Sequence, residues 1–176
     1  QPLHTGIGHR HSLYLDGGDE HLRYGVDLLY NEIKGVMKGS DRQTFTGGIT
    51  LAYRYKDLLF RNQLSTTLNR ANDSPYGSFD EYAKLNPYWT ATDENGNVKR
   101  FFDEDYSYWG GNNPANPLYN ATLNTKETSD YTNITNNFSI EWKPVQEFTL
   151  RGTFGIYTQT NNSDKYLPPE HTAFAD

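Results

Sequence analysis

The sequence contains no cysteine, a single methionine, and no apolar run that approaches the ~20 residues of a membrane-spanning helix. Without cysteine there are no disulfide bonds, no thiolate catalysis and no cysteine-ligated metal. The lack of a long apolar run argues against a membrane-spanning helix in these residues. The first residues, Gln1-Pro2-Leu3-His4, lack the charged and apolar regions of a signal peptide. For an exported protein we therefore expect a mature chain or an internal fragment.

The chain also lacks an excess of basic residues, with 16 Lys and Arg against 22 Asp and Glu and a net charge of -6. No basic patch stands out, so nucleic acid is not expected as a partner. Ser, His and Asp all occur, but no nucleophile elbow or other catalytic spacing joins them. We therefore expect neither an enzyme nor a bound cofactor.

Low hydropathy and many aromatic residues occur together. Hydrophobic residues make up 35% of the chain and aromatic residues 15%, while the mean hydropathy is -0.86. Low hydropathy favours disorder, whereas Tyr, Phe and Trp favour strands and bury large areas. A barrel with a polar lumen satisfies both observations, because only half of each strand must be apolar.

Six segments alternate apolar and polar residues with a period of two, which is typical of strands. In one of them Leu22, Val26 and Leu28 share a face, and Arg23 and Asp27 lie on the other. The segments lie near residues 10–16, 21–31, 42–55, 58–69, 131–142 and 147–159. Most are longer than the ~5–6 residues of an average strand, and they match the ~9–11 residues with which a tilted strand crosses a bilayer.

The connections between these segments alternate in length. Residues 17–20, 55–57 and 143–146 form tight turns, whereas residues 31–41 and 70–130 form longer loops and an open tail follows Gln159. Short turns on one side and long loops on the other are typical of outer-membrane barrels, with the short turns periplasmic. Aromatic residues lie at both ends of the apolar faces: Tyr53, Phe60, Trp142 and Phe148 beside tight turns, and Tyr30 and Phe45 at the other end.

We therefore predict an all-β fold, an antiparallel up-and-down meander of about six long strands. The meander forms an incomplete segment of a transmembrane β-barrel with one long extracellular loop, because the smallest such barrels have about eight strands. The alternative is a soluble or surface-attached β-sandwich that binds carbohydrate, which shows the same alternation. A second sheet would bury Leu22, Val26 and Leu28 in a sandwich, whereas a barrel leaves them facing outward.

The order of short motifs resembles the middle of the barrel in the SusC/RagA family of TonB-linked outer-membrane transporters. The resemblance covers nearly the whole chain. The motifs are Arg10-His11-Ser12-Leu13, Gly17-Gly18, Leu22-Arg23-Tyr24-Gly25, Gly35-Val36-Met37-Lys38-Gly39-Ser40-Asp41-Arg42, Leu58-Leu59-Phe60-Arg61-Asn62, Ser74-Pro75-Tyr76-Gly77-Ser78-Phe79, Asn86-Pro87-Tyr88-Trp89, Asp93-Glu94-Asn95-Gly96-Asn97, Asn116-Pro117-Leu118-Tyr119-Asn120, Arg151-Gly152 and Pro168-Pro169-Glu170-His171.

The resemblance implies a bacterial outer-membrane protein that imports glycans or peptides. Members of the family pair with a SusD-like surface lipoprotein and are energised by TonB through an N-terminal plug. The motifs here match the barrel alone, so this chain is expected to supply wall and loops, with the plug and the TonB-contacting segment absent from it.

The long loop combines aromatic rings, which stack on sugars, with Asn amides, which donate and accept hydrogen bonds. We predict ligand binding, of an oligosaccharide or peptide, at Tyr88, Trp89, Tyr108, Trp109 and Asn113, with the two tryptophans as candidates for ligand or lipoprotein contact. The alternative is that these aromatic residues form the loop's own small core, because a loop this long must bury something to stay ordered.

Other polar clusters have simpler interpretations. Asp93-Glu94 and Asp103-Glu104-Asp105 suggest calcium, but the spacing of an EF-hand is missing and turn acids explain them. His9 and His11 would share a strand face without an identifiable third ligand, so no metal site is predicted. Four arginines fall on polar faces, where they would line the lumen or pair with Asp27 and Glu141. These arginines are Arg23, Arg54, Arg61 and Arg151.

Overall fold

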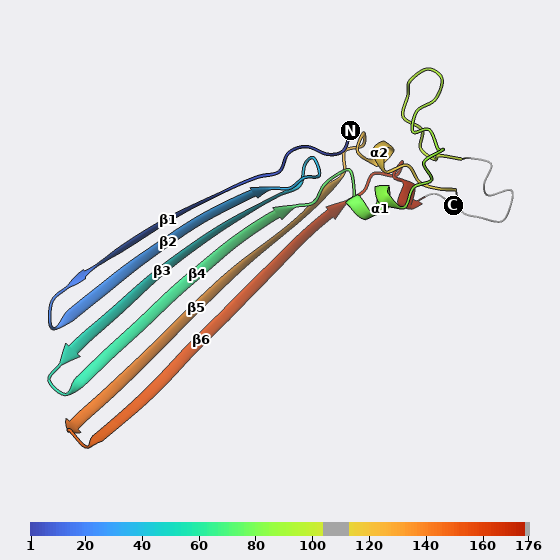
Figure 1. Cartoon of the computed structure of the whole chain (residues 1–176). Helices are drawn as coiled ribbons and strands as arrows, with labels where there is room; N and C mark the ends of the chain where they lie inside the picture. The colour runs from blue at the N-terminus through green and yellow to red at the C-terminus, as the bar shows by residue number, and fades with distance from the viewer. Residues whose placement is uncertain (104–112, 175–176) are drawn as a thin grey trace.

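Six strands form one antiparallel sheet in the computed structural model, which describes residues 1–103 and 113–174 (Figure 1). Each strand pairs with the next one along the chain, so the predicted six-stranded meander is confirmed. The sheet is not closed into a barrel, and β1 and β6 are its two edges. The strands are β1 (Ile7–Gly18), β2 (Leu22–Lys34), β3 (Asp41–Tyr55), β4 (Leu58–Asn72), β5 (Lys126–Val145) and β6 (Phe148–Tyr166).

Short helical turns occur only in the connections of the described chain. They are α1 (Phe79–Ala83), α2 (Pro117–Asn120) and the 3-10 turn η2 (Thr172–Phe174). Figure 1 shows these elements and the N-terminus at one end of the sheet, and the three tight turns at the other. No helix in residues 1–103 or 113–174 is long and apolar enough to cross a membrane.

The last two strands are longer than the alternation predicts. β5 has 20 residues and β6 has 19, so the long loop is shortened to residues 73–125 and the predicted open tail after Gln159 is instead strand as far as Tyr166. The side chains of both faces are mostly polar in these extensions, residues 126–130 and 160–166, so the sequence shows no alternation there from which a strand could be predicted. Ion pairs between the strands join Lys126 to Asp164 at 2.5 Å and Lys165 to Glu127 at 2.9 Å.

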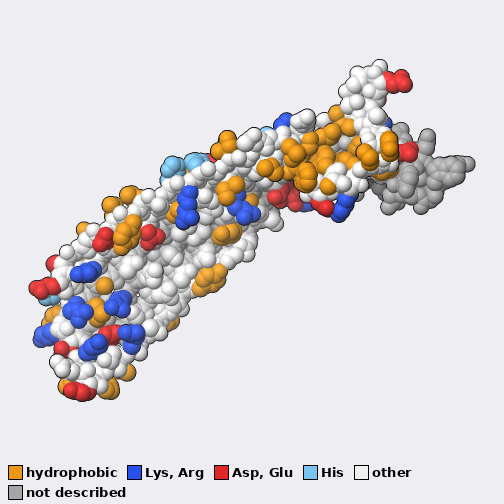
Figure 2. Space-filling view, viewed as in Figure 1, with side chains coloured by type: hydrophobic (Ala, Val, Ile, Leu, Met, Phe, Trp, Pro, Cys, Tyr) orange, Lys and Arg blue, Asp and Glu red, His pale blue; other side chains and the backbone are white. Residues whose placement is uncertain are grey.

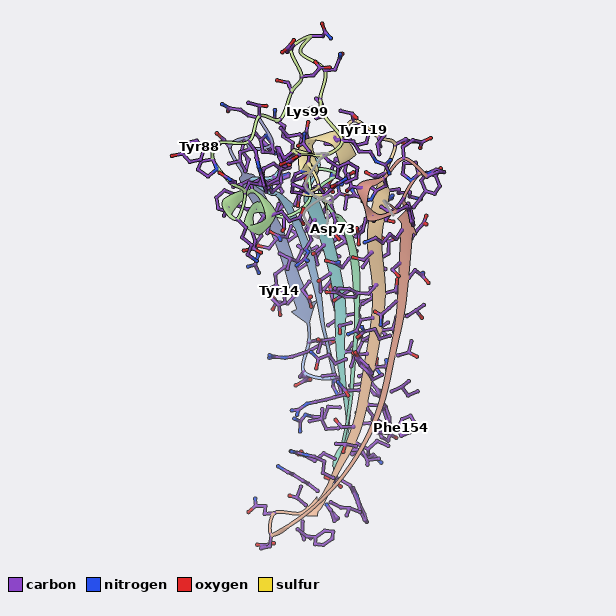
Figure 3. All side chains as sticks on the ribbon, turned by 90° about the vertical axis from the view of Figure 1, so that its right-hand side faces the viewer. Tyr14, Asp73, Tyr88, Lys99, Tyr119 and Phe154 are labelled. Atoms are coloured by element: carbon purple, nitrogen blue, oxygen red, sulfur yellow. The ribbon has the colours of Figure 1, made fainter. Side chains whose placement is uncertain are left out.

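The register places the predicted apolar residues on one face of the sheet. Leu15, Val26, Ile49 and Leu64 lie opposite one another across β1 to β4 and form one row. Neighbouring residues along each strand point to the other side. Figure 3 shows one residue of each face, Tyr14 of β1 on the polar side and Phe154 of β6 on the apolar side. One face is therefore apolar and the other polar across all six strands.

No second layer covers the apolar face within the described chain. Ile49 is 44% exposed and Leu51 is 43% exposed, although both lie in the middle of the sheet. Each strand packs extensively only against the strands next to it in the sheet. The accessible surface is 12778 Å², against roughly 8,800 Å² for a compact monomer of this mass. A β-sandwich would bury these residues, so the sheet does not have the alternative fold.

The tight turns are staggered along the sheet. Leu22, the first residue of β2 after the first turn, lies opposite Tyr53, and β3 continues two residues further, to Tyr55. Leu58 at the second turn lies opposite Trp142, and the third hairpin continues two rows further, because the bulge between Trp142 and Val145 sets three residues of β5 against two of β6. Each hairpin therefore extends roughly 7 Å beyond the previous one over the roughly 10 Å that separates alternate strands. A line through the turns is inclined by roughly 35° from the perpendicular to the strands.

The apolar band follows the same oblique line. Its upper limit lies at Phe45 on β3, and Phe45 shares a row with Leu68 and Thr132. On β5 the band begins two residues lower, at Ile134, and on β6 it begins a further two residues lower, at Ile156. Tyr30 on β2 lies in the same row as Phe45, so over the four spacings from β2 to β6, about 19 Å, the limit descends by about 13 Å. The apolar band and the tight turns are therefore parallel to each other and oblique to the strands.

We expect Gly18→Ala to lower the free energy of unfolding by about 1–3 kcal/mol, because the first turn requires glycine. Gly18 has a φ of +132°, and a Cβ there would lie 2.0 Å from the carbonyl oxygen of Leu22. Denaturant unfolding followed by Trp fluorescence measures the change. Gly152→Ala is the control, because nothing lies within 4 Å of its Cβ position. Equal losses in both variants would show that the turn tolerates a side chain.

Candidate ligand-binding rim

The rim is the end of the sheet opposite the tight turns, formed by residues 35–40, 73–103, 113–125 and 167–174. Side chains and backbone join its segments. The Ser74 hydroxyl donates to the carbonyl of Lys38 at 2.7 Å, and the Lys38 amide donates to the carbonyl of Pro2 at 2.9 Å. At the other side Asn120 and Thr172 exchange two hydrogen bonds, of 2.7 and 3.2 Å. Loops that are distant in sequence are therefore held as one layer.

Asn116 organises the described part of the long loop. Its side chain is fully buried, with 0% exposure. The amide nitrogen donates to the carbonyls of Ala91 at 3.0 Å and Lys99 at 2.7 Å, and the amide oxygen accepts from the N–H of Leu118 at 3.1 Å. Three backbone groups of the loop thus form hydrogen bonds with this one side-chain amide, and the amide oxygen also caps the N-terminus of α2. Asn116 was one of several asparagines in an aromatic-rich loop, and nothing in its spacing marked it as central.

Three of the five predicted ligand residues lie in the described chain. Tyr88 is 91% exposed at the outer edge of the rim, as Figure 3 shows. Trp89 stacks on Phe102, which is buried, with ring centroids 5.4 Å apart and planes at 13°. Asn113 is half-buried. Tyr108 and Trp109 lie outside the described residues. The predicted loop core therefore includes one face of Trp89, while Tyr88 presents a free ring to a ligand.

A cavity of about 260 Å³ lies where the end of β4, α2 and the C-terminal segment meet. Its wall is of mixed character, and it is open to solvent. Its wall includes Asp73, Tyr76, Glu81, Asn120, Lys165 and His171. None of the predicted ligand residues in the described chain lines this cavity. It forms only when distant segments meet, so no local motif could identify it.

Two groups near the cavity have shifted pKa values. Burial, followed by the charges of Lys165 and Arg100, lowers the pKa of His171, so its ring is neutral at pH 7. Its Nδ1 accepts from the N–H of Ala173 at 3.0 Å. Burial, followed by the nearby Glu81 and Tyr76, raises the pKa of Tyr82 to about 12, so its hydroxyl remains a donor, to the carbonyl of Tyr76 at 2.8 Å.

Asp93 forms a turn, as the simpler interpretation predicted. Its carboxylate accepts from the backbone N–H groups of Asn95 at 2.9 Å and Asn97 at 2.8 Å, and from the Asn97 side chain at 3.1 Å. Glu104 and Asp105 lie outside the described residues. Within the described chain no three His, Asp or Glu side chains are grouped to hold a metal ion. The Nε2 atom of His9 lies 3.7 Å from a carboxylate oxygen of Glu32.

We expect the Asp93 carboxyl to titrate below the usual value of 3.8, because the Asn97 side chain and then the backbone amides lower its pKa. A pKa lowered by folding stabilises the turn above the unfolded value, and this stabilisation is lost as the pH falls through the folded pKa. NMR titration of the carboxyl carbon measures the midpoint. Asn97→Ala should raise it, and equal midpoints in the two proteins would contradict the assignment.

The polar face carries an uncharged belt below the rim. Thr44 donates to Asn69 at 3.0 Å, and Thr46 lies 3.3 Å from Thr67 across the same strand pair. On β6 the Tyr157 hydroxyl donates to Gln159 at 2.5 Å, which donates to Asn161 at 2.8 Å. Hydroxyl and amide groups of this kind suit contact with water or a polar solute.

No family model matches the chain, and no curated protein matches it either. Membership of the SusC/RagA family therefore stays a prediction from the sequence motifs.

Proposed function

We propose that this chain is a segment of the wall and external rim of an outer-membrane, TonB-dependent importer of the SusC/RagA kind. The apolar face contacts lipid, the polar face lines the lumen, and the tight turns lie on the periplasmic side. The observation that carries the proposal is the exposed apolar band, which is oblique to the strands and parallel to the line of tight turns.

A membrane explains why the band and the turns share a direction. Strands in outer-membrane barrels are tilted by about 35–45° from the membrane normal, so a level layer of lipid crosses them obliquely. The stagger of the turns and the descent of the apolar limit each give roughly 35°. On β3 the band runs from Phe45 to Tyr53, and on β5 from Ile134 to Trp142, which is eight residues each time. Eight residues at that tilt cover roughly 20 Å, close to the ~25 Å apolar band of such barrels.

The other face suits an aqueous lumen. On this face Thr44 bonds to Asn69 and Gln159 bonds to Asn161, and these side chains are exposed or half-buried, whereas Asn62 and Asn136 lie on the apolar face and bond to each other. A lipid-facing surface of this composition would leave amides without water. In the proposed orientation the rim lies outside the cell, with Tyr88 and the 260 Å³ cavity available to a solute.

The partners follow from the family resemblance. A SusD-like lipoprotein would sit on the rim, and TonB would act through a plug domain, which these six strands do not supply. The solute is an oligosaccharide or a peptide, captured at the rim before plug movement admits it to the lumen. The reaction is transport, and no covalent chemistry is assigned to these residues.

Fractionation of cells that produce the intact parent protein tests the proposal. We expect the protein in the outer-membrane fraction, extracted only by detergent, and with a faster gel migration before heating than after it, because a closed barrel resists unfolding by detergent at room temperature. Recovery of the protein in the aqueous fraction without detergent would overturn the proposal.

A further inference from the structure

Four arginines gather on the polar face near the tight turns. Arg23 on β2 and Arg61 on β4 lie in one row, on either side of Ala52. Arg54 on β3 and Arg151 on β6 lie in the next row towards the turns. Figure 2 shows Lys and Arg side chains concentrated at this end of the sheet, whereas the middle of the same face is largely uncharged. We call Arg23, Arg54, Arg61 and Arg151 the arginine cluster.

Three members of the cluster have no partner in the described chain. Arg151 donates to Glu141, which Lys143 also approaches at 3.4 Å, so this carboxylate is already shared. Arg23, Arg54 and Arg61 form no ion pair and no side-chain hydrogen bond with any residue in 1–103 or 113–174. All three are exposed.

The carboxylate expected to pair with these arginines is directed elsewhere. Asp27 lies over Gly48, where a Cβ would fall 2.3 Å from its Oδ1, because glycine leaves room for the carboxylate against the sheet. No ion pair joins Asp27 to an arginine of the described chain. The prediction that Glu141 pairs with an arginine is confirmed for Arg151, and the pairing of Asp27 is wrong.

The dimensions of the cluster restrict what can occupy it. Arg54 and Arg151 are three strands apart, about 14 Å across the sheet, so one small anion cannot contact both. The residues between them in the two rows offer no aromatic ring on which a sugar could stack. They are Ala52, Leu59, Ser139 and Glu141. Guanidinium groups bind carboxylates in a two-point geometry and are frequent in protein interfaces.

We propose that the arginine cluster is a docking surface for an acidic polypeptide segment with several carboxylates. The segment crosses the strands at the turn end of the polar face and supplies the partners that Arg23, Arg54 and Arg61 lack. This inference requires only that the polar face be open, and it holds whether or not the apolar face contacts lipid.

Binding of a fluorescein-labelled hexaglutamate peptide to the protein, purified in mild detergent, tests the docking surface. The double variant Arg54→Gln/Arg61→Gln should bind about tenfold more weakly, since two exposed ion pairs are lost. The matched control is Arg10→Gln/Arg42→Gln, which removes the same charge from the loop end of the same face. Its affinity should equal that of the unmodified protein. Fluorescence anisotropy at low and physiological salt measures binding, and circular dichroism checks the fold of each variant.

Three results would overturn the inference. Equal weakening in the two double variants would mean that hexaglutamate responds to net charge alone. Absence of binding at low salt would remove the docking surface altogether. Tighter binding of trigalacturonate than of hexaglutamate, with the same dependence on Arg54 and Arg61, would assign the cluster to an acidic sugar. None of these results bears on whether the protein fractionates with the membrane.

Discussion

Replacing Ile49 with arginine should destabilise the folded protein in a bilayer by about 2–4 kcal/mol, the cost of a cationic side chain at the lipid-facing midplane of a barrel. Ile49 lies in the middle of the apolar band, with Val26 and Leu64 on either side, and is 44% exposed without a covering layer. Equilibrium folding into lipid vesicles, followed by Trp fluorescence and protease protection, measures the difference in free energy.

The adjacent residue provides the matched control. Thr50 is also exposed but points to the polar face, in the row that contains Gln63 and Asn137. Thr50→Arg places the same charge one residue away, on the side that we assign to the lumen, so the free energy of folding should change little. Equal costs for the two variants, or a larger cost for Thr50→Arg, would contradict the orientation of the sheet.

Asn116→Ala should reduce the stability of the long loop by about 3 kcal/mol, because the change removes three hydrogen bonds to half-buried backbone groups, of which only the carbonyl of Ala91 keeps another partner in the described chain, the N–H of Lys99. The carbonyls of Ala91 and Lys99 lose a donor and the N–H of Leu118 loses an acceptor. Hydrogen exchange at the amides that close the loop should accelerate about a hundredfold. The amides of Lys99 and Phe102, which donate to Ala91 and Pro114, are suitable probes.

The sheet should not respond to that change, since the loop and the strands are separately hydrogen-bonded. Exchange in β3 and β4 should therefore stay slow. Asn95→Ala is the control within the loop, because Asn95 is exposed and only its backbone N–H donates to Asp93. Unchanged exchange at Lys99 and Phe102 in the Asn116 variant would show that the buried amide does not hold the loop together.

Strand positions could be predicted where one face is apolar. The alternation across 42–55 identifies β3 to within one residue and that across 21–31 identifies β2 to within three, and the tight turns define their pairing. The extension of β5 escaped prediction because Thr128 and Asp130 on one face, and Glu127 and Ser129 on the other, show no hydrophobic period. In that part of the sheet strand pairing and ion pairs, which are contacts between distant segments, decide the structure.

The rim was less predictable than the sheet. Aromatic composition indicated a loop core, and the stacking of Trp89 on Phe102 shows part of it. Sequence alone could not show that Tyr88 is free while its neighbour is stacked, because both are aromatic residues after the same proline. It also could not identify the cavity, since His171 and Asp73 are almost a hundred positions apart and meet only through the strands between them.

The stagger of the tight turns has a consequence for the opposite end of the sheet. β1 to β4 reach the same row there, with Ile7, Lys34, Asp41 and Asn72 in line, and β5 and β6 continue beyond it. If the turns lie level with the periplasmic surface, the far ends climb from β1 to β6 by roughly 15–20 Å. The external opening of the barrel would then be oblique, with its edge lowest at β1 and highest at β6. A bulky molecule would enter across the lower edge at β1, and the higher edge at β6 would lie on its far side.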